Sequence, residues 1–80
     1  MMFNEIGEKV TLLDLPAGTM FSYTSPKGYT CIALKSEYFH PHGGVEAIIL
    51  GSGEFFWGDA HTAAELNQQM VQPLELINEQ

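Results

Sequence analysis

Turn signals divide this chain into segments too short for long helices. "LPAGT" spans residues 15–19, "SPKG" residues 25–28 and "GSG" residues 51–53, and each combines glycine with proline or serine. Glycine and proline set the backbone for tight turns, whereas an isolated helix needs about 12 residues or more. The segments between the turns are therefore expected to be short β-strands.

Side-chain alternation assigns a face to several of these strands. Residues 45–51 are apolar on both faces, which predicts a central strand covered by the core and by another layer or subunit. Residues 71–77 contain Pro73, which cannot donate to a strand ladder, and this favours an edge strand or a bulge. Residues 29–38 form the longest strand. We expect the following side chains of that strand to point inward: Thr30, Ile32, Leu34, Ser36 and Tyr38.

The strands add up to an all-β fold. We expect a small single-domain barrel or β-roll of about six short strands over residues 1–80, with residues 54–59 as one of them. Thr62 is a possible cap for one helical turn. A chain of 80 residues buries roughly 60% of its unfolded surface, so self-association is a natural supplement to its core.

Charge and cysteine content limit the environment and the partners. The only cysteine, Cys31, is expected to be a buried, inert thiol, and a single cysteine fits a reducing, cytoplasmic setting. No apolar run is long enough for a membrane span. The net charge is −7, all of it after Lys35, and the chain has no arginine. Direct nucleic-acid binding is therefore disfavoured, whereas a positively charged partner fits.

Two histidines one residue apart raise the possibility of a metal site. His40, His42 and Glu46 have the spacing H-x-H-x3-E, which resembles part of the first cupin motif and implies a transition metal inside a β-barrel. Leu34 stands where that motif has its leading glycine, and no second motif supplies a fourth ligand. We therefore predict no metal and no cofactor, with a minimal metal-dependent cupin-like enzyme as the alternative.

Three consecutive aromatic residues give the other prominent feature. In a strand, Phe56 lies on one face while Phe55 and Trp57 lie on the other. If Phe56 fills the core, its neighbours need a subunit or a ligand to cover them, and Tyr38 could join that surface. The alternative is a structural protein that assembles through this aromatic face. We find no complete catalytic constellation.

The order of several motifs resembles small β-domain proteins encoded in bacteriophage genomes. "LPAGTMFSY", "IALKSEY", "VEAIILGSGEFFWG" and "VQPLELI" follow one another between residues 10 and 77. The resemblance implies a phage or prophage accessory protein in the cytoplasm of a bacterial host. It further implies a non-enzymatic binding protein that antagonises a host defence system, by sequestering a signalling nucleotide or by blocking a defence protein.

Each of these two actions predicts its own set of residues. A nucleotide-like ligand would need stacking rings and anion donors, and a homo-oligomer interface could supply them. The candidates for that ligand are Tyr38, Phe55, Trp57, Lys35, Gly51, Ser52 and Gly53. Blocking a basic defence protein would instead use an acidic surface. The candidates for that surface are Glu37, Glu46, Glu54, Asp59 and Glu65.

Overall fold

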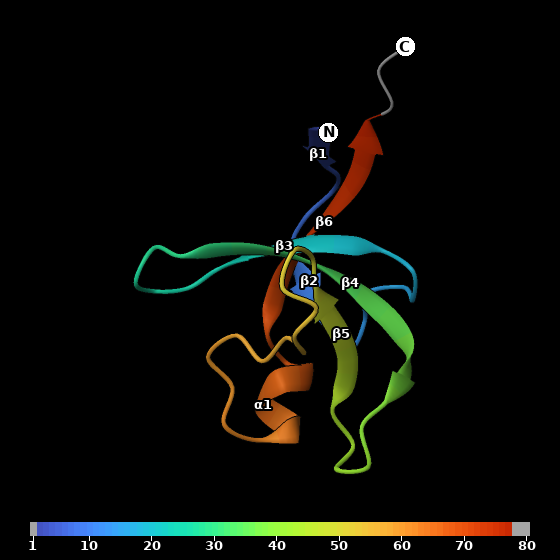
Figure 1. Cartoon of the computed structure of the whole chain (residues 1–80), viewed down its shortest axis with the longest axis vertical. Coiled ribbons are helices and arrows are strands. Elements are labelled where there is room, and N and C mark those ends of the chain that lie inside the picture. Colours follow the sequence, from blue (N-terminus) through green and yellow to red (C-terminus); the bar gives the residue numbers. More distant parts are fainter. Residues whose placement is uncertain (1, 78–80) are drawn as a thin grey trace.

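The computed structural model describes residues 2–77 as one antiparallel sheet with a short helix below it (Figure 1). The elements in chain order are β1 (Met2–Glu5), β2 (Val10–Thr11), β3 (Met20–Thr24), β4 (Thr30–Phe39), β5 (Val45–Ile49), α1 (Ala63–Asn67) and β6 (Met70–Ile77). The strand order is β1-β6-β3-β4-β5, and β2 also pairs with β6.

This sheet confirms the predicted all-β fold, but it does not close into a barrel. Within residues 2–77 the strand order starts at β1 and ends at β5, and no ladder joins these two strands. The sheet bends strongly instead, so the β1–β6 ribbon and β5 project to opposite sides of the β3–β4 hairpin (Figure 1). The concave inner side of this bend holds the core and α1.

The predicted positions of β5 and β6 were wrong. β6 pairs with β1, β2 and β3, whereas β5 ends the strand order. The carbonyl of Pro73 accepts from the amide of Ile6. The N–H and C=O of one residue point to the same side of an antiparallel strand, so the side on which Pro73 lacks its N–H faces the loop between β1 and β2. Pro73 is tolerated inside the sheet for this reason. At that loop the side-chain amide of Gln72 donates to the carbonyls of Ile6 (3.4 Å) and Gly7 (3.2 Å).

The inward face of β4 is also the opposite of the predicted one. Ala33 and Lys35 are buried, whereas Leu34 is 38% exposed and Tyr38 is 63% exposed. The apolar alternation was misleading because the lysine, and not the leucine, finds partners inside the domain. The pairing of β4 with β5 then shifts register between Lys35 and Phe39, so the end of β4 bulges away from the core.

Residues 54–59, predicted as a strand, form only an isolated bridge. Phe55 pairs with Ile48 in that bridge, and Gly58, at a φ of 59°, then turns the chain. The predicted opposite placement is confirmed for Phe55 and Phe56 but not for Trp57, which is half-buried and packs against the core. Phe56 is buried in the core, whereas Phe55 is 50% exposed.

The short helix forms where its cap was predicted. The hydroxyl of Thr62 accepts from the amide of Glu65, and the Glu65 carboxylate accepts from the amide of His61. This reciprocal arrangement satisfies amides at the start of α1. Leu66 is the buried residue of the helix and joins the core. Within residues 2–77, no helix has the length and apolar character needed to cross a membrane.

Lys35 joins the sheet to the turn that follows β2. Its ammonium donates to the carbonyls of Leu12 and Leu13 at 2.8 Å each, and also to that of Leu15. Burial lowers the pKa of Lys35, and the negative charge of Asp14 opposes this shift. The core beneath this contact contains Leu12, Leu15, Phe21, Ala33, Val45, Ala47, Phe56, Leu66 and Val71.

Lys35→Met is expected to destabilise the domain although it keeps the length of the side chain. The substitution removes the donors of three carbonyls, and an unpaired buried polar group costs about 1–3 kcal/mol. We therefore expect a loss of about 3 kcal/mol in the free energy of unfolding, measured by urea denaturation. Lys9→Met, at an exposed lysine, is the matched control and should leave the midpoint unchanged.

Candidate functional site

The predicted aromatic and histidine residues come together at the end of the β4–β5 hairpin. The ring of His40 lies 4.6 Å from that of Phe55 in an edge-to-face arrangement and 4.9 Å from that of His42. Trp57 lies 5.1 Å from His42 and stacks on His40 at 6.4 Å, between ring centroids. The histidines therefore pack against the aromatic residues, His40 half-buried and His42 still exposed to solvent.

The cupin-like metal site is not assembled. Within residues 2–77, no group of three or more His, Cys, Asp or Glu side chains could hold a metal ion, so Glu46 does not complete a site with the histidines. Nδ1 of His42 accepts from the amide of Gly44 over 3.1 Å. Nε2 of His40 is buried and has no hydrogen-bond partner among residues 2–77. The rings are held by packing, as in a structural cluster.

The residues predicted to bind a nucleotide-like ligand do not form one site. Lys35 is only 7% exposed, and its ammonium is already bound by carbonyls. Tyr38 lines a separate hollow beside Gly18 on the bulged part of β4. Gly51 and Gly53 adopt positive φ angles in a turn, and the amide of Gly53 donates to a carbonyl of β5 instead of pointing to a ligand.

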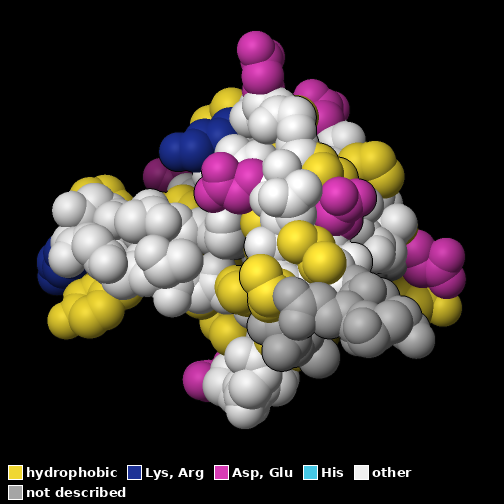
Figure 2. Space-filling view, turned by 90° about the horizontal axis from the view of Figure 1, so that it is seen from above, with side chains coloured by type: hydrophobic (Ala, Val, Ile, Leu, Met, Phe, Trp, Pro, Cys, Tyr) yellow, Lys and Arg dark blue, Asp and Glu magenta, His cyan; other side chains and the backbone are white. Residues whose placement is uncertain are grey.

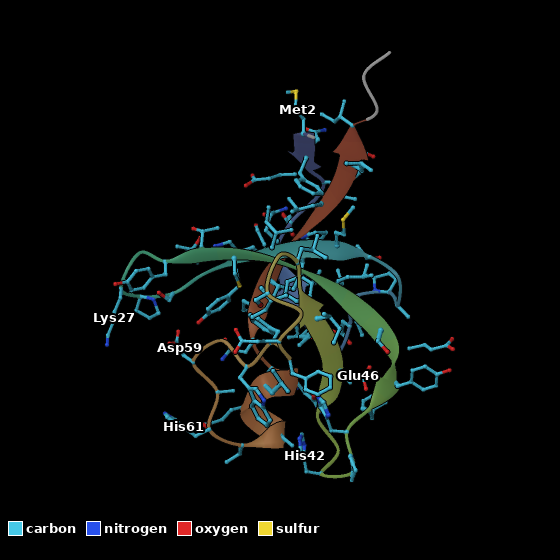
Figure 3. The ribbon with its side chains drawn as sticks, in the orientation of Figure 1. Met2, Lys27, His42, Glu46, Asp59 and His61 are labelled. Carbon is cyan, nitrogen blue, oxygen red and sulfur yellow. The ribbon has the colours of Figure 1, made fainter. Side chains whose placement is uncertain are left out.

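The predicted acidic residues are spread over the molecule. Asp59 and Glu46 lie on opposite sides of the ribbon (Figure 3). Glu65 is engaged at the start of α1, and Ser52 holds the turn before Glu54 by accepting from its amide over 3.2 Å. The exposed Glu37 lies on the bulged end of β4. These acids therefore do not form a single cluster.

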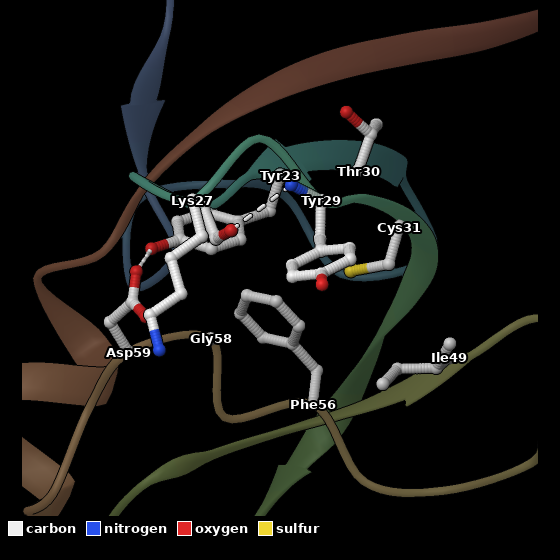
Figure 4. A pocket seen from close by; sticks show the side chains of 10 residues that line it. Tyr23, Lys27, Tyr29, Thr30, Cys31, Ile49, Phe56, Gly58 and Asp59 are labelled. Carbon is white, nitrogen blue, oxygen red and sulfur yellow. Dashed lines mark hydrogen bonds between the residues drawn. The ribbon is translucent and has the colours of Figure 1, made fainter.

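A pocket that the sequence analysis missed lies beside the β3–β4 hairpin (Figure 4). Its volume is about 430 Å³, which falls in the range of small-molecule sites. Three aromatic rings, one cation, one carboxylate and one thiol line it. The residues that supply these groups are Tyr23, Tyr29, Phe56, Lys27, Asp59 and Cys31.

The floor of this pocket is rigid because it belongs to the core. The Phe56 ring packs edge-to-face on Phe21 at 5.1 Å and on Tyr23 at 5.3 Å, between centroids. Phe56 itself is buried. Cys31 lies beside this floor on β4, and burial raises the pKa of its thiol. The thiol is therefore an apolar part of the wall and is not activated as a nucleophile.

The rim of the pocket is set by the predicted turn at residues 25–28. The amide of Gly28 donates to the carbonyl of Ser25 over 2.9 Å, and the amide of Ser25 donates to the carbonyl of Tyr29 over 2.7 Å. Gly28 has a φ of 92°, as the hairpin with a glycine bulge requires. This turn presents the exposed Lys27 and Tyr29 beside the pocket, with 76% of Tyr29 exposed.

The opposite wall is fixed by a hydrogen bond from Tyr23 to Asp59. The phenol donates to one carboxylate oxygen, Oδ2, of Asp59. Burial and this bond raise the pKa of Tyr23 to about 12. Tyr23 therefore stays protonated at neutral pH, and Oδ1 of Asp59 is left as an acceptor toward the pocket. These two residues are 36 positions apart, so no local sequence motif predicts their contact.

The Tyr23–Asp59 bond predicts a late tyrosine titration. Because folding raises the pKa of Tyr23, its protonated phenol stabilises the folded state at every pH below the ordinary tyrosine pKa of 10. This contribution to the free energy of unfolding is lost as the pH rises to about 12. We expect the ultraviolet absorbance of tyrosinate to show one phase near pH 12, which Tyr23→Phe removes. Asp59→Asn should move that phase to lower pH. An unchanged phase in Asp59→Asn would contradict the contact.

The orphaned nitrogen of His40 predicts a stabilising substitution. His40→Phe keeps a ring against Phe55 and Trp57 and removes a buried polar atom that has no partner. The gain in the free energy of unfolding should be about 1 kcal/mol, measured by urea denaturation. His61→Phe, at an exposed histidine, is the control. A loss of stability in His40→Phe would mean that the nitrogen has a partner.

Comparison with known proteins adds no likeness from which a function could be transferred. No protein-family model, no curated protein and no solved structure matches the chain. The class of ligand is therefore inferred from the aromatic rings and charged groups that line the pocket.

Proposed function

We propose that this protein is a non-enzymatic binding protein that takes up a small, planar, nucleotide-like ligand in the hairpin pocket. One observation carries the proposal: a pocket of about 430 Å³ combines three aromatic rings with a single lysine and a single carboxylate. Aromatic rings bind the faces of planar heterocycles, and a base stacked on an aromatic side chain gains about 1–3 kcal/mol.

The charges of the pocket define the polar part of the ligand. Oδ1 of Asp59 can accept a hydrogen bond from an N–H group on the edge of a base, because Tyr23 occupies only Oδ2. Lys27 can pair with one phosphate group. The rest of the chain is acidic, with a net charge of −7, so ligands with several negative charges are repelled. A nucleoside or a nucleoside monophosphate fits best.

The resemblance to phage-encoded β-domain proteins gives this binding a biological role. A phage accessory protein that holds a nucleotide without converting it would lower the free concentration of a host signal. We therefore propose sequestration as the way in which the protein antagonises a bacterial defence system. The pocket supports binding without chemistry, because burial keeps the thiol of Cys31 protonated and Asp59 is held by Tyr23.

Thermal unfolding with a panel of nucleosides and nucleoside monophosphates tests the proposal. A ligand that binds the folded state raises the midpoint of unfolding as its concentration exceeds the dissociation constant. We expect at least one panel member to raise the midpoint. Tyr29→Ala should weaken its binding about tenfold in calorimetric titration, because the stacking ring is lost.

Matched variants separate the pocket from general effects. Tyr38→Ala removes another exposed tyrosine outside the pocket and should leave affinity unchanged. Lys27→Ala should weaken the monophosphate but not the nucleoside, whereas Lys9→Ala should affect neither. If no panel member stabilises the protein, or if Tyr29→Ala binds as tightly as the parent chain, the pocket is not the binding site.

A further inference from the structure

A row of apolar side chains crosses the outer face of the sheet, and polar side chains such as Ser22 and Gln72 share that face beside the row. Pairing partners across an antiparallel ladder share a face, so the register identifies the side chains of this face directly. Leu74 pairs with Met20, Met20 with Leu34, Leu34 with Ile48 and Ile48 with Phe55. Leu76 and its partner Phe3 continue this face along the β1–β6 ribbon.

The chain covers the inner face of the sheet, and on the outer face it covers Leu74, which is 6% exposed. Phe21, Ala33 and Ala47 lie on that inner face and pack with Phe56 and Leu66 in the core. On the outer face Leu34, Phe55 and Leu76 are 38%, 50% and 47% exposed. A solvated face of an antiparallel sheet is normally polar, so this outer face has the composition of a surface that a second layer covers.

The charged groups of the outer face lie at its two ends, and all of them are acidic. Glu5 shares the face with its partner Leu74 on the β1–β6 ribbon, and Glu46 shares it with Ile48 on β5. Glu54 is exposed beside Phe55 in the chain. Seen from the side on which β1 and β6 project, apolar side chains lie among several acidic ones, with lysine side chains at the edge of the view (Figure 2).

None of the three lysines belongs to this face. Lys9 and Lys27 lie in loops between strands, and Lys35 points into the inner side of the sheet. A partner that covers the face therefore meets apolar side chains in the middle and negative charge at both ends. The complementary surface is apolar and carries Lys or Arg at its ends.

We propose that the outer face docks another protein whose contact surface is apolar and flanked by basic side chains. A second copy of this chain fits less well than such a partner. When a twofold axis aligns the apolar rows of two copies, an acidic end of one copy, at Glu5 or Glu46, meets an acidic end of the other. This docking does not depend on the hairpin pocket, because the apolar row does not line it. The row consists of Leu74, Met20, Leu34, Ile48 and Phe55.

A defined peptide tests the docking surface. In an extended synthetic peptide with two lysines at each end and alternating Leu and Ser between them, the leucines share one face and the cations lie at both ends. We expect calorimetric titration to show that the full chain binds this peptide, and that binding weakens as salt rises from low to physiological ionic strength. Leu34→Glu in the middle of the row and Phe55→Ala at its end should each weaken binding about tenfold.

Control variants and peptides decide whether the face or the net charge is responsible. Leu13→Glu, at a leucine that is 41% exposed and lies outside the sheet, should bind like the parent chain. The same peptide with serine in place of every leucine should bind at least tenfold more weakly, and one with glutamate in place of every lysine should not bind. Equal binding of the serine peptide, or unchanged binding by both face variants, overturns the proposal.

Sedimentation of the free chain tests the competing occupant. A monomer at all concentrations is expected if the face is kept for a basic partner. A concentration-dependent dimer that Leu34→Glu dissolves would show that a second copy covers the face, and would overturn the proposed partner. Either result leaves the nucleotide titrations of the hairpin pocket unchanged, so the two proposals can fail separately.

Discussion

The fold depends on one buried ammonium group. Lys35 lies in the middle of the longest strand and donates to the carbonyls of Leu12, Leu13 and Leu15, which fixes the turn after β2 against the sheet. That turn supplies Leu12 and Leu15 to the core. A buried charge without partners would cost several kcal/mol, so the carbonyls determine which face of β4 points inward. The inward face then places Cys31 in the pocket and Leu34 outside.

The sequence predicted correctly those parts of the fold that are determined by residues close together in the chain. The turn at residues 25–28, the cap at Thr62 and the opposite placement of Phe55 and Phe56 all follow from neighbouring residues, and the structure contains each of them. Strand order does not follow from neighbours. Pro73 suggested an edge strand, yet the side chain of Gln72 replaces the missing donor and lets β6 pair on both sides.

The candidate site was less predictable because its members are distant in sequence. Tyr23 and Asp59 meet only after β3 and the loop beyond β5 lie side by side, and Phe56 reaches the pocket from the core. The predicted ligand residues failed for the same reason. Lys35 is close to Tyr38 in sequence, but the lysine points inward and the tyrosine lies on the bulged, exposed end of β4. Exposure of a lysine cannot be inferred from its charge when distant carbonyls bind it.

The two-sided apolar character of residues 45–51 connects the fold to both proposed interactions. Val45 and Ala47 bury the inner side of β5, on which the pocket floor rests, and Ile48 belongs to the outer row. One strand therefore contributes to both proposed sites, the pocket for a small ligand and the surface for a protein. The aromatic pair that follows the strand is divided in the same way, because Phe56 lines the pocket and Phe55 pairs with Ile48 at the end of the outer row.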